Sequence, residues 1–101
     1  MQRIILLLIM VSLSGTAVAA QPLQAVFERE SRVALSNPHD LKLSPDGQYL
    51  LVSDVGNNRV AILDPDSLEL VGQFGADHQA GTHDIDFDKN GLAYVADTHN
   101  N

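Results

Sequence analysis

The chain contains no cysteine and no tryptophan, and basic residues are scarce. Without cysteine there is no disulfide framework, so stability must come from packing rather than from covalent links. Six lysines and arginines stand against thirteen aspartates and glutamates, which gives a formal net charge of −7. Such an acidic chain is poorly suited to nucleic acid or to anionic lipid. We therefore expect no nucleic-acid partner.

Signatures of several enzyme classes are also missing. The sequence contains no G-x-S-x-G element, no glycine-rich phosphate loop and no cysteine pair. These absences remove the usual pointers to a serine hydrolase, a nucleotide-binding enzyme or a thiolate metal site. The sequence identifies no catalytic residue.

The longest apolar run, residues 4–11, is too short to cross a bilayer, which takes roughly 20 residues. Arg3 precedes the run and small residues follow it up to Ala20, which is the order of a secretory signal peptide. We expect residues 1–20 to be a signal peptide of a secreted or periplasmic protein, with no membrane contact after cleavage. An uncleaved membrane anchor is the alternative.

What the chain does have is an internal repeat, because residues 39–58 return in similar form as residues 83–101. The two His-Asp pairs are 44 residues apart. Self-similarity with a period in the forties indicates a repeat architecture, and four short strands per unit indicate a β-propeller blade. The predicted fold class is therefore all-β. The matched positions are His39 and His83, Asp40 and Asp84, Gly47 and Gly91, Asp54 and Asp97, and Asn57 and Asn100.

Alternating and apolar segments, separated by Gly, Pro, Asn and Asp, predict four antiparallel strands in a first complete blade at residues 38–75. The expected strands cover residues 40–44, 49–53, 59–63 and 68–74. Residues 76–101 are predicted to form a connector and the first half of a second blade. The lead-in at 21–37 fits either a short helix or an outer strand.

Propeller units cannot bury their apolar faces alone, and roughly three or more are needed for a stable stack. We therefore expect this sequence to be the opening part of a longer protein, with the remaining blades supplied by the same protein.

The repeated residues resemble a known family. The pattern D-x-x-G-x-x-Y-V-A-D-x-x-N-N at residues 88–101 is similar to the NHL repeat of six-bladed β-propellers, and residues 46–60 fit almost as well. Residues 49–53 and 60–64 also resemble the YVTN class of seven-bladed propellers, which is the alternative. The NHL resemblance implies blades of four antiparallel strands arranged around a central channel.

His39 and His83 are the candidate functional residues. Each begins an inner strand, where the blades of a propeller converge on its channel, so both side chains are expected to approach a common volume. Neutral imidazole is a common metal ligand, and Asp40 and Asp84 are candidates for orienting the rings from behind. A bound Zn²⁺ or Ca²⁺ is the cofactor considered. The structural alternative is that both histidines cap turns through backbone hydrogen bonds.

The same placement resembles that of the peptidylglycine amidating lyases, NHL-type propellers that hold a metal through channel histidines. The resemblance implies that His39 and His83 are metal ligands and extends to lactonase-like propellers. Residues resembling the lyase's catalytic tyrosine or arginine are not found in a matching context.

Asp54 and Asp97 each end a second strand just before a turn. Such an aspartate is expected to accept backbone N–H groups, and Asp54 is also expected to pair with Arg59. These positions are predicted to be structural, together with the turn glycines and the amides Asn57 and Asn100.

Three functions remain open from the sequence. The first is a secreted or periplasmic propeller that binds a small-molecule or protein ligand. The second is a metal-dependent lyase or lactone hydrolase, in which the metal would polarise a substrate oxygen or activate water. The third is a purely structural interaction module.

Overall fold

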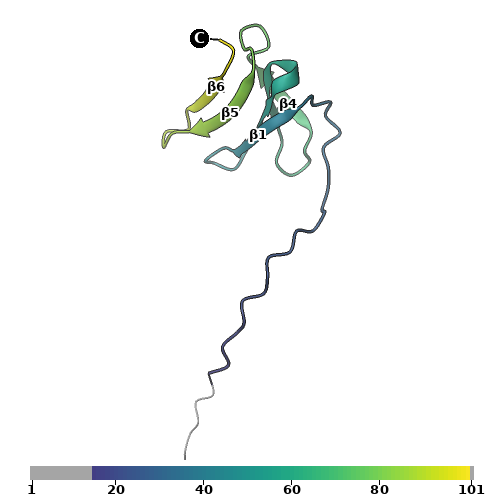
Figure 1. Ribbon diagram of the computed structural model, residues 1–101, viewed down its shortest axis with the longest axis vertical. Coiled ribbons are helices and arrows are strands. Elements are labelled where there is room, and N and C mark those ends of the chain that lie inside the picture. Colours follow the sequence, from purple (N-terminus) through teal and green to yellow (C-terminus); the bar gives the residue numbers. More distant parts are fainter. Residues whose placement is uncertain (1–14, 101) are drawn as a thin grey trace, which may run out of the picture.

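The computed structural model describes residues 15–100, which form an all-β structure. Figure 1 shows two small sheets side by side, with the N-terminal segment running away from them. The elements are β1 (Pro38–Leu43), β2 (Leu50–Asp54), the short 3-10 helix η1 (Val55–Asn57), β3 (Arg59–Leu63), β4 (Leu70–Phe74), β5 (Thr82–Phe87) and β6 (Ala93–Asp97).

The strands form two antiparallel sheets, one ordered β1-β2-β3-β4 and one made of β5 and β6. The predicted all-β class is confirmed. The strand of the first sheet expected from residue 68 begins instead at Leu70, because Leu68 adopts a positive φ of 59° within the β3–β4 turn. Its N–H group donates to the carbonyl oxygen of Asp64 at 2.9 Å, which closes that turn before the strand starts.

The two matched glycines close equivalent turns. Gly47 (φ 72°) donates its N–H to the carbonyl oxygen of Ser44 at 2.8 Å, and Gly91 (φ 82°) donates to that of Asp88 at 3.1 Å. A residue with a Cβ pays a steric penalty at such a φ, which explains why glycine stands at both positions. The turn expected after Asp54 is the helix η1, which ends where Asn58 adopts a φ of 49°.

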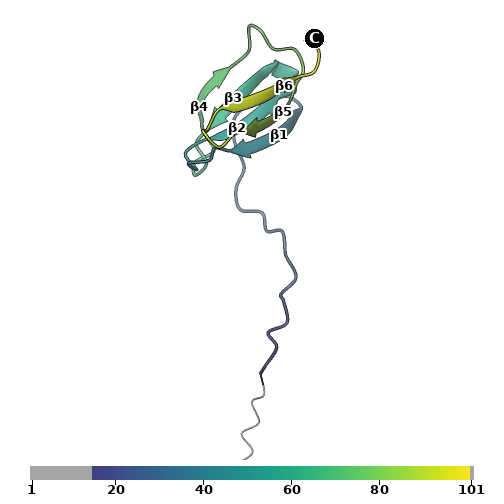
Figure 2. The same cartoon turned by 90° about the vertical axis from the view of Figure 1, so that its left-hand side faces the viewer.

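The core lies between the two sheets, which Figure 2 shows stacked on each other. Leu51 and Val60 of the first sheet pack with Ile85 of the second, and all three are buried. On the opposite face of the first sheet, a second cluster contains three buried residues, Val52, Ala61 and Leu63. The first sheet therefore buries apolar side chains on both faces.

The lead-in contains neither the helix nor the strand considered for it, since residues 21–37 have no regular secondary structure. Its C-terminal part covers the second cluster through Val33 and Leu35. Ser31 fastens it there, because its Oγ donates to the carbonyl oxygen of Leu68 at 2.8 Å. Packing rather than strand pairing thus holds this segment on the sheet.

Most of the expected signal peptide lies outside the described residues. Its last part, residues 15–20, is exposed and has no regular secondary structure. Over residues 15–100, no helix has the length and apolar character needed to cross a membrane.

The contact between the sheets predicts a difference between two valines. Val60 is fully buried and Val71 is 55% exposed, and both lie in strands of the first sheet. We expect Val60→Ala to lower the free energy of unfolding by about 2 kcal/mol, because it removes two buried methyl groups and leaves a cavity. Urea unfolding of the two variants measures this.

Val71→Ala is the matched control and should cost less than about 0.5 kcal/mol, as is usual for exposed positions. Equal losses in the two variants would contradict a core located between the sheets.

Candidate functional site

The imidazole rings of His39 and His83 lie against each other, with centroids 4.1 Å apart and planes at 72°. Both side chains are exposed, near the beginning of β1 and of β5. Each histidine lies in a register shift at the same place in its unit. The structure thus brings together the two residues that the repeat singled out.

Ser53 holds the two inner strands together. This residue of β2 is fully buried, and its Oγ accepts the N–H of Asp40 at 2.7 Å. The same hydroxyl donates to the carbonyl oxygen of His83 at 3.1 Å. A single serine side chain therefore joins β1 to β5 beside the histidines. Sequence reasoning gave Ser53 no role; the only signal was a hydroxyl residue within an apolar strand.

The backbone before each histidine bends in the same way. Asn37 has a φ of 50° and the equivalent Gly81 has a φ of 77°. The Asn37 side chain also reaches His39, with Nδ2 3.3 Å from the ring Nε2. The bend turns the chain into the inner strand and leaves the following histidine at the exposed edge.

Asp40 and Asp84, expected behind the rings, both bind the backbone N–H of Ile85, at 3.1 Å each. Neither carboxylate has a hydrogen bond to an imidazole among the described residues. The N–H of Ile85 lowers the pKa of Asp40 despite the opposing effect of burial. The side chain of Asp40 therefore ties β1 to β5.

The Asp54 carboxylate is completely buried and binds three donors. Oδ1 accepts the N–H of Ser36 at 2.7 Å. Oδ2 accepts Asn57 Nδ2 at 2.8 Å and Arg59 Nε at 2.7 Å. We call Asp54 with these donors the Asp54 clamp. It joins the segment before β1 to the turn after β2.

The second unit repeats this arrangement around Asp97, and we call it the Asp97 clamp. Asp97 Oδ1 accepts the N–H of Ala80 at 2.7 Å, and Oδ2 accepts Asn100 Nδ2 at 2.6 Å. The asparagine side chain also donates to an equivalent backbone carbonyl in each unit. Asn57 donates to the carbonyl oxygen of Ala34, and Asn100 donates to that of His78. Each clamp thus fixes the chain three residues before a histidine. The Asp97 clamp shows no arginine among the described residues.

The donors of the Asp54 clamp determine its charge state. Burial raises the pKa of Asp54, but the hydrogen bonds from Asn57, from the Ser36 N–H and from Arg59 outweigh it and hold the pKa below its ordinary value. The carboxylate is therefore ionised at neutral pH. The Arg59 guanidinium also donates hydrogen bonds to Gln73 Oε1 at 2.6 Å and to the carbonyl oxygen of Ala34 at 3.1 Å.

The paired imidazoles supply two nitrogen atoms, fewer than a metal site requires. A catalytic zinc ordinarily takes three protein ligands and keeps an open position. Within residues 15–100, no group of three or more histidine, cysteine or acidic side chains is placed to hold a metal ion. His78 and His99 are exposed loop residues outside the pair. Two nitrogen donors favour Zn²⁺ over Ca²⁺, which prefers oxygen ligands.

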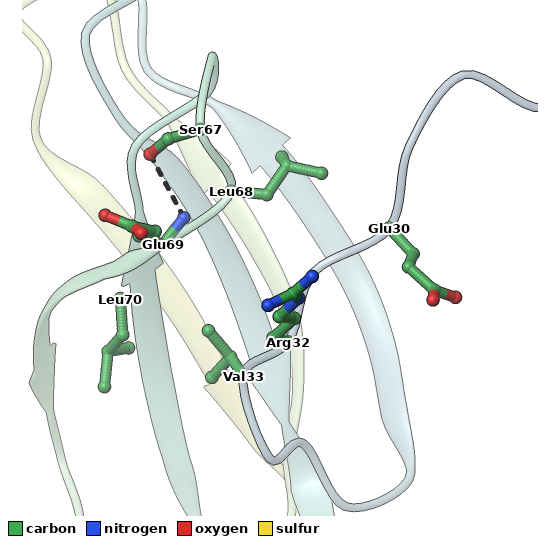
Figure 3. Close-up of a pocket in the computed structure, with 7 residues that line it drawn as sticks. All are labelled: Glu30, Arg32, Val33, Ser67, Leu68, Glu69 and Leu70. Atoms are coloured by element: carbon green, nitrogen blue, oxygen red, sulfur yellow. Dashed lines mark hydrogen bonds between the residues drawn. The ribbon is translucent and has the colours of Figure 1, made fainter.

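Two cavities lie away from the histidines. One, of about 340 Å³, is formed where the lead-in meets the β3–β4 turn (Figure 3). Its lining residues are Glu30, Arg32, Val33, Ser67, Leu68, Glu69 and Leu70. The other, of about 510 Å³, lies between the β1–β2 and β5–β6 turns, at the opposite end of the inner strands from the histidines. Neither cavity is lined by the matched histidines.

Comparison with known protein families, with curated proteins and with solved structures finds no match to this chain. The resemblance to NHL repeats therefore remains a prediction that rests on the repeated residues.

The Asp54 clamp predicts an acid-dependent loss of stability. We expect Asp54→Asn to lower the free energy of unfolding at pH 7 by about 3 kcal/mol, because it removes the buried charge that Arg59, itself half-buried, pairs with. The folded-state pKa of Asp54 is depressed, so its stabilisation is present at neutral pH and is lost as the pH falls below ~4. Urea unfolding at pH 7 and at pH 3 measures both effects.

Asp97→Asn is the matched control, at the half-buried equivalent position. It should cost about 1 kcal/mol, because only neutral hydrogen-bond donors are affected. A gap between wild type and Asp54→Asn that persists unchanged at low pH would contradict the ionised clamp.

Proposed function

We propose that this protein is a secreted or periplasmic binding module of the NHL-propeller type, whose recognition point is the edge carrying His39 and His83. The observation that carries the proposal is the contact between these two exposed imidazoles, 4.1 Å apart between centroids although far apart in the sequence. Exposed polar side chains presented by a rigid strand framework are the ordinary form of a recognition surface.

The framework around the pair supports this function. The two clamps and the Ser53 hydroxyl fix the backbone on both sides of the histidines. The rings themselves point to solvent and retain nitrogen atoms that can donate or accept. A polar small molecule or a peptide segment could therefore bind here without rearranging the core.

A fragment screen tests the recognition point. We expect small carboxylate and amide fragments to shift the imidazole proton resonances of His39 and His83, because paired ring nitrogens offer two adjacent hydrogen-bonding groups. The measurement is protein-observed NMR with labelled histidine.

His78 and His99 are internal references in the same spectra and should not move. Fragments that perturb only the cavity between the two turns, near Tyr49 and Lys89, would place recognition at the wrong end of the strands and contradict the proposal.

The second candidate is a metal-dependent lyase or lactone hydrolase. The observation that favours it is the same pair of imidazoles, which supplies two of the nitrogen ligands that a zinc site requires. A third ligand is not supplied by residues 15–100. In such an enzyme His39 and His83 would hold the metal and the metal would activate water, while Asp40 and Ser53 would keep the ligand strands in register.

Zinc titration tests this candidate. We expect Zn²⁺ to bind the wild type, and His39→Ala or His83→Ala to weaken binding at least about tenfold, because each removes one of two ligands. Isothermal calorimetry of the metal alone measures it. The doubly substituted His78→Ala/His99→Ala control should bind like the wild type. A wild type that takes up no Zn²⁺ would remove the enzyme candidate.

A further inference from the structure

The turn between β5 and β6 holds the only asparagine–glycine pair in the sequence, Asn90 followed by Gly91. Glycine has no Cβ, so its backbone nitrogen is the least hindered neighbour that a side-chain amide can have. Both residues are exposed, and a Cβ placed on Gly91 would meet no atom of a non-neighbouring residue within 4 Å. The pair is therefore accessible to water and free of steric hindrance.

The side-chain amide of Asn90 is free, in contrast to those of the other asparagines. Among residues 15–100, every other asparagine has a side-chain hydrogen bond: Asn37, Asn57, Asn58 and Asn100. The Asn90 amide has none within this range, whereas its backbone N–H donates to Asp88 Oδ1 at 2.8 Å. Asn90 thus combines an unheld amide with the least hindered following nitrogen.

The equivalent turn of the first unit is protected. Asp46 stands there before Gly47, and its Oδ1 accepts the Ser44 hydroxyl and the N–H of Gln48, which hold the side chain in place. Asp46 is nevertheless exposed, although the second unit bounds the cavity of about 510 Å³ beside it. A residue at this turn position therefore stays exposed where another unit packs beside it. The exposure of Asn90 is in this sense a property of the turn.

We propose that Asn90 is a site of self-modification, at which its amide is converted to a carboxylate through a cyclic imide. The Gly91 nitrogen loses its proton and forms a bond to Cγ of Asn90, the Cγ–Nδ2 bond breaks, and Nδ2 leaves as ammonia. Water then opens the ring. Opening at the bond to Cγ gives an aspartate, and opening at the other carbonyl gives an isoaspartate, in which the backbone runs through Cγ. The net reaction consumes water and releases ammonia.

The product changes the turn in two ways. A new negative charge appears at the cavity that Asp46, Lys89 and Asn90 line together. In the isoaspartate form the backbone before Gly91 is also longer by one atom, which moves the Gly91 N–H away from the carbonyl oxygen of Asp88, its partner at 3.1 Å. The β5–β6 turn is loosened at the end of the inner strands opposite to the histidines, so the site is separate from the recognition point proposed above.

Timed peptide mapping tests the site. The full chain is kept folded at pH 8, digested at intervals and analysed by mass spectrometry. The fragment containing residue 90 should gain about one dalton, at a rate at least about tenfold higher than at Asn57, Asn58 or Asn100, because only Asn90 precedes a glycine nitrogen. Incubation at pH 6 should slow the gain, since the attacking nitrogen must lose its proton. The chain unfolded in urea is the positive control for the unconstrained sequence.

Two variants separate the site from its surroundings. Asn90→Gln should abolish the gain, because a glutamine would have to close a larger ring, and circular dichroism melting should match the wild type. Asp46→Asn places the same asparagine–glycine pair in the protected turn and should react about fivefold more slowly than Asn90, because two hydrogen bonds hold its side chain. A folded chain that keeps Asn90 intact while the unfolded chain reacts would overturn the proposal, as would equal rates at Asn90 and at the Asp46→Asn position.

Discussion

The buried carboxylate of Asp54 is the interaction on which the rest of the structure depends. Removing a charge from water is costly unless it is paired and hydrogen-bonded, and here a backbone N–H, an amide and a guanidinium provide that compensation. The three donors come from the lead-in, the β2–β3 turn and the start of β3. Their convergence on one residue fixes where the chain enters β1. In a cysteine-free chain, this network joins segments that a disulfide would join elsewhere.

Turn geometry accounts for part of the negative charge of the chain. Asp46 accepts the hydroxyl of Ser44 and the N–H of Gln48, and these bonds lower its pKa. Asp64 accepts two successive N–H groups in the β3–β4 turn, with the same effect on its pKa. In the turn before β6, the Asp88 carboxylate likewise accepts the N–H groups of Asn90 and Leu92. These carboxylates accept backbone N–H groups in turns, so the acidity of the chain does not by itself indicate a cation site.

The apolar pattern and the turn residues were enough to predict the strands of the first sheet, and the place of Asp54 before a turn was enough to predict its pairing with Arg59. Both depend on contacts between near neighbours in sequence. The start of β4 at Leu70 could not be predicted, since it follows from the positive φ of Leu68 rather than from apolar pattern. The link made by Ser53 was also beyond the sequence. Its hydroxyl is buried only because the second sheet covers it, and that packing involves a residue 30 positions away. The same long-range packing directs the carboxylate of Asp40 to the N–H of Ile85, 45 positions away.

If the histidine edge is the recognition point proposed above, stability and recognition are carried there by different atoms. The clamps act on the backbone of Ser36 and Ala80, three residues before each histidine, and Ser53 acts on the carbonyl of His83. The imidazoles contribute little to this network, since they are exposed and His39 bonds only the nearby Asn37 side chain among the described residues. The framework would therefore position whatever side chains stood at these two sites. The exposed side chains of such a surface can change without changing how the chain folds, because they are not the residues that hold the backbone.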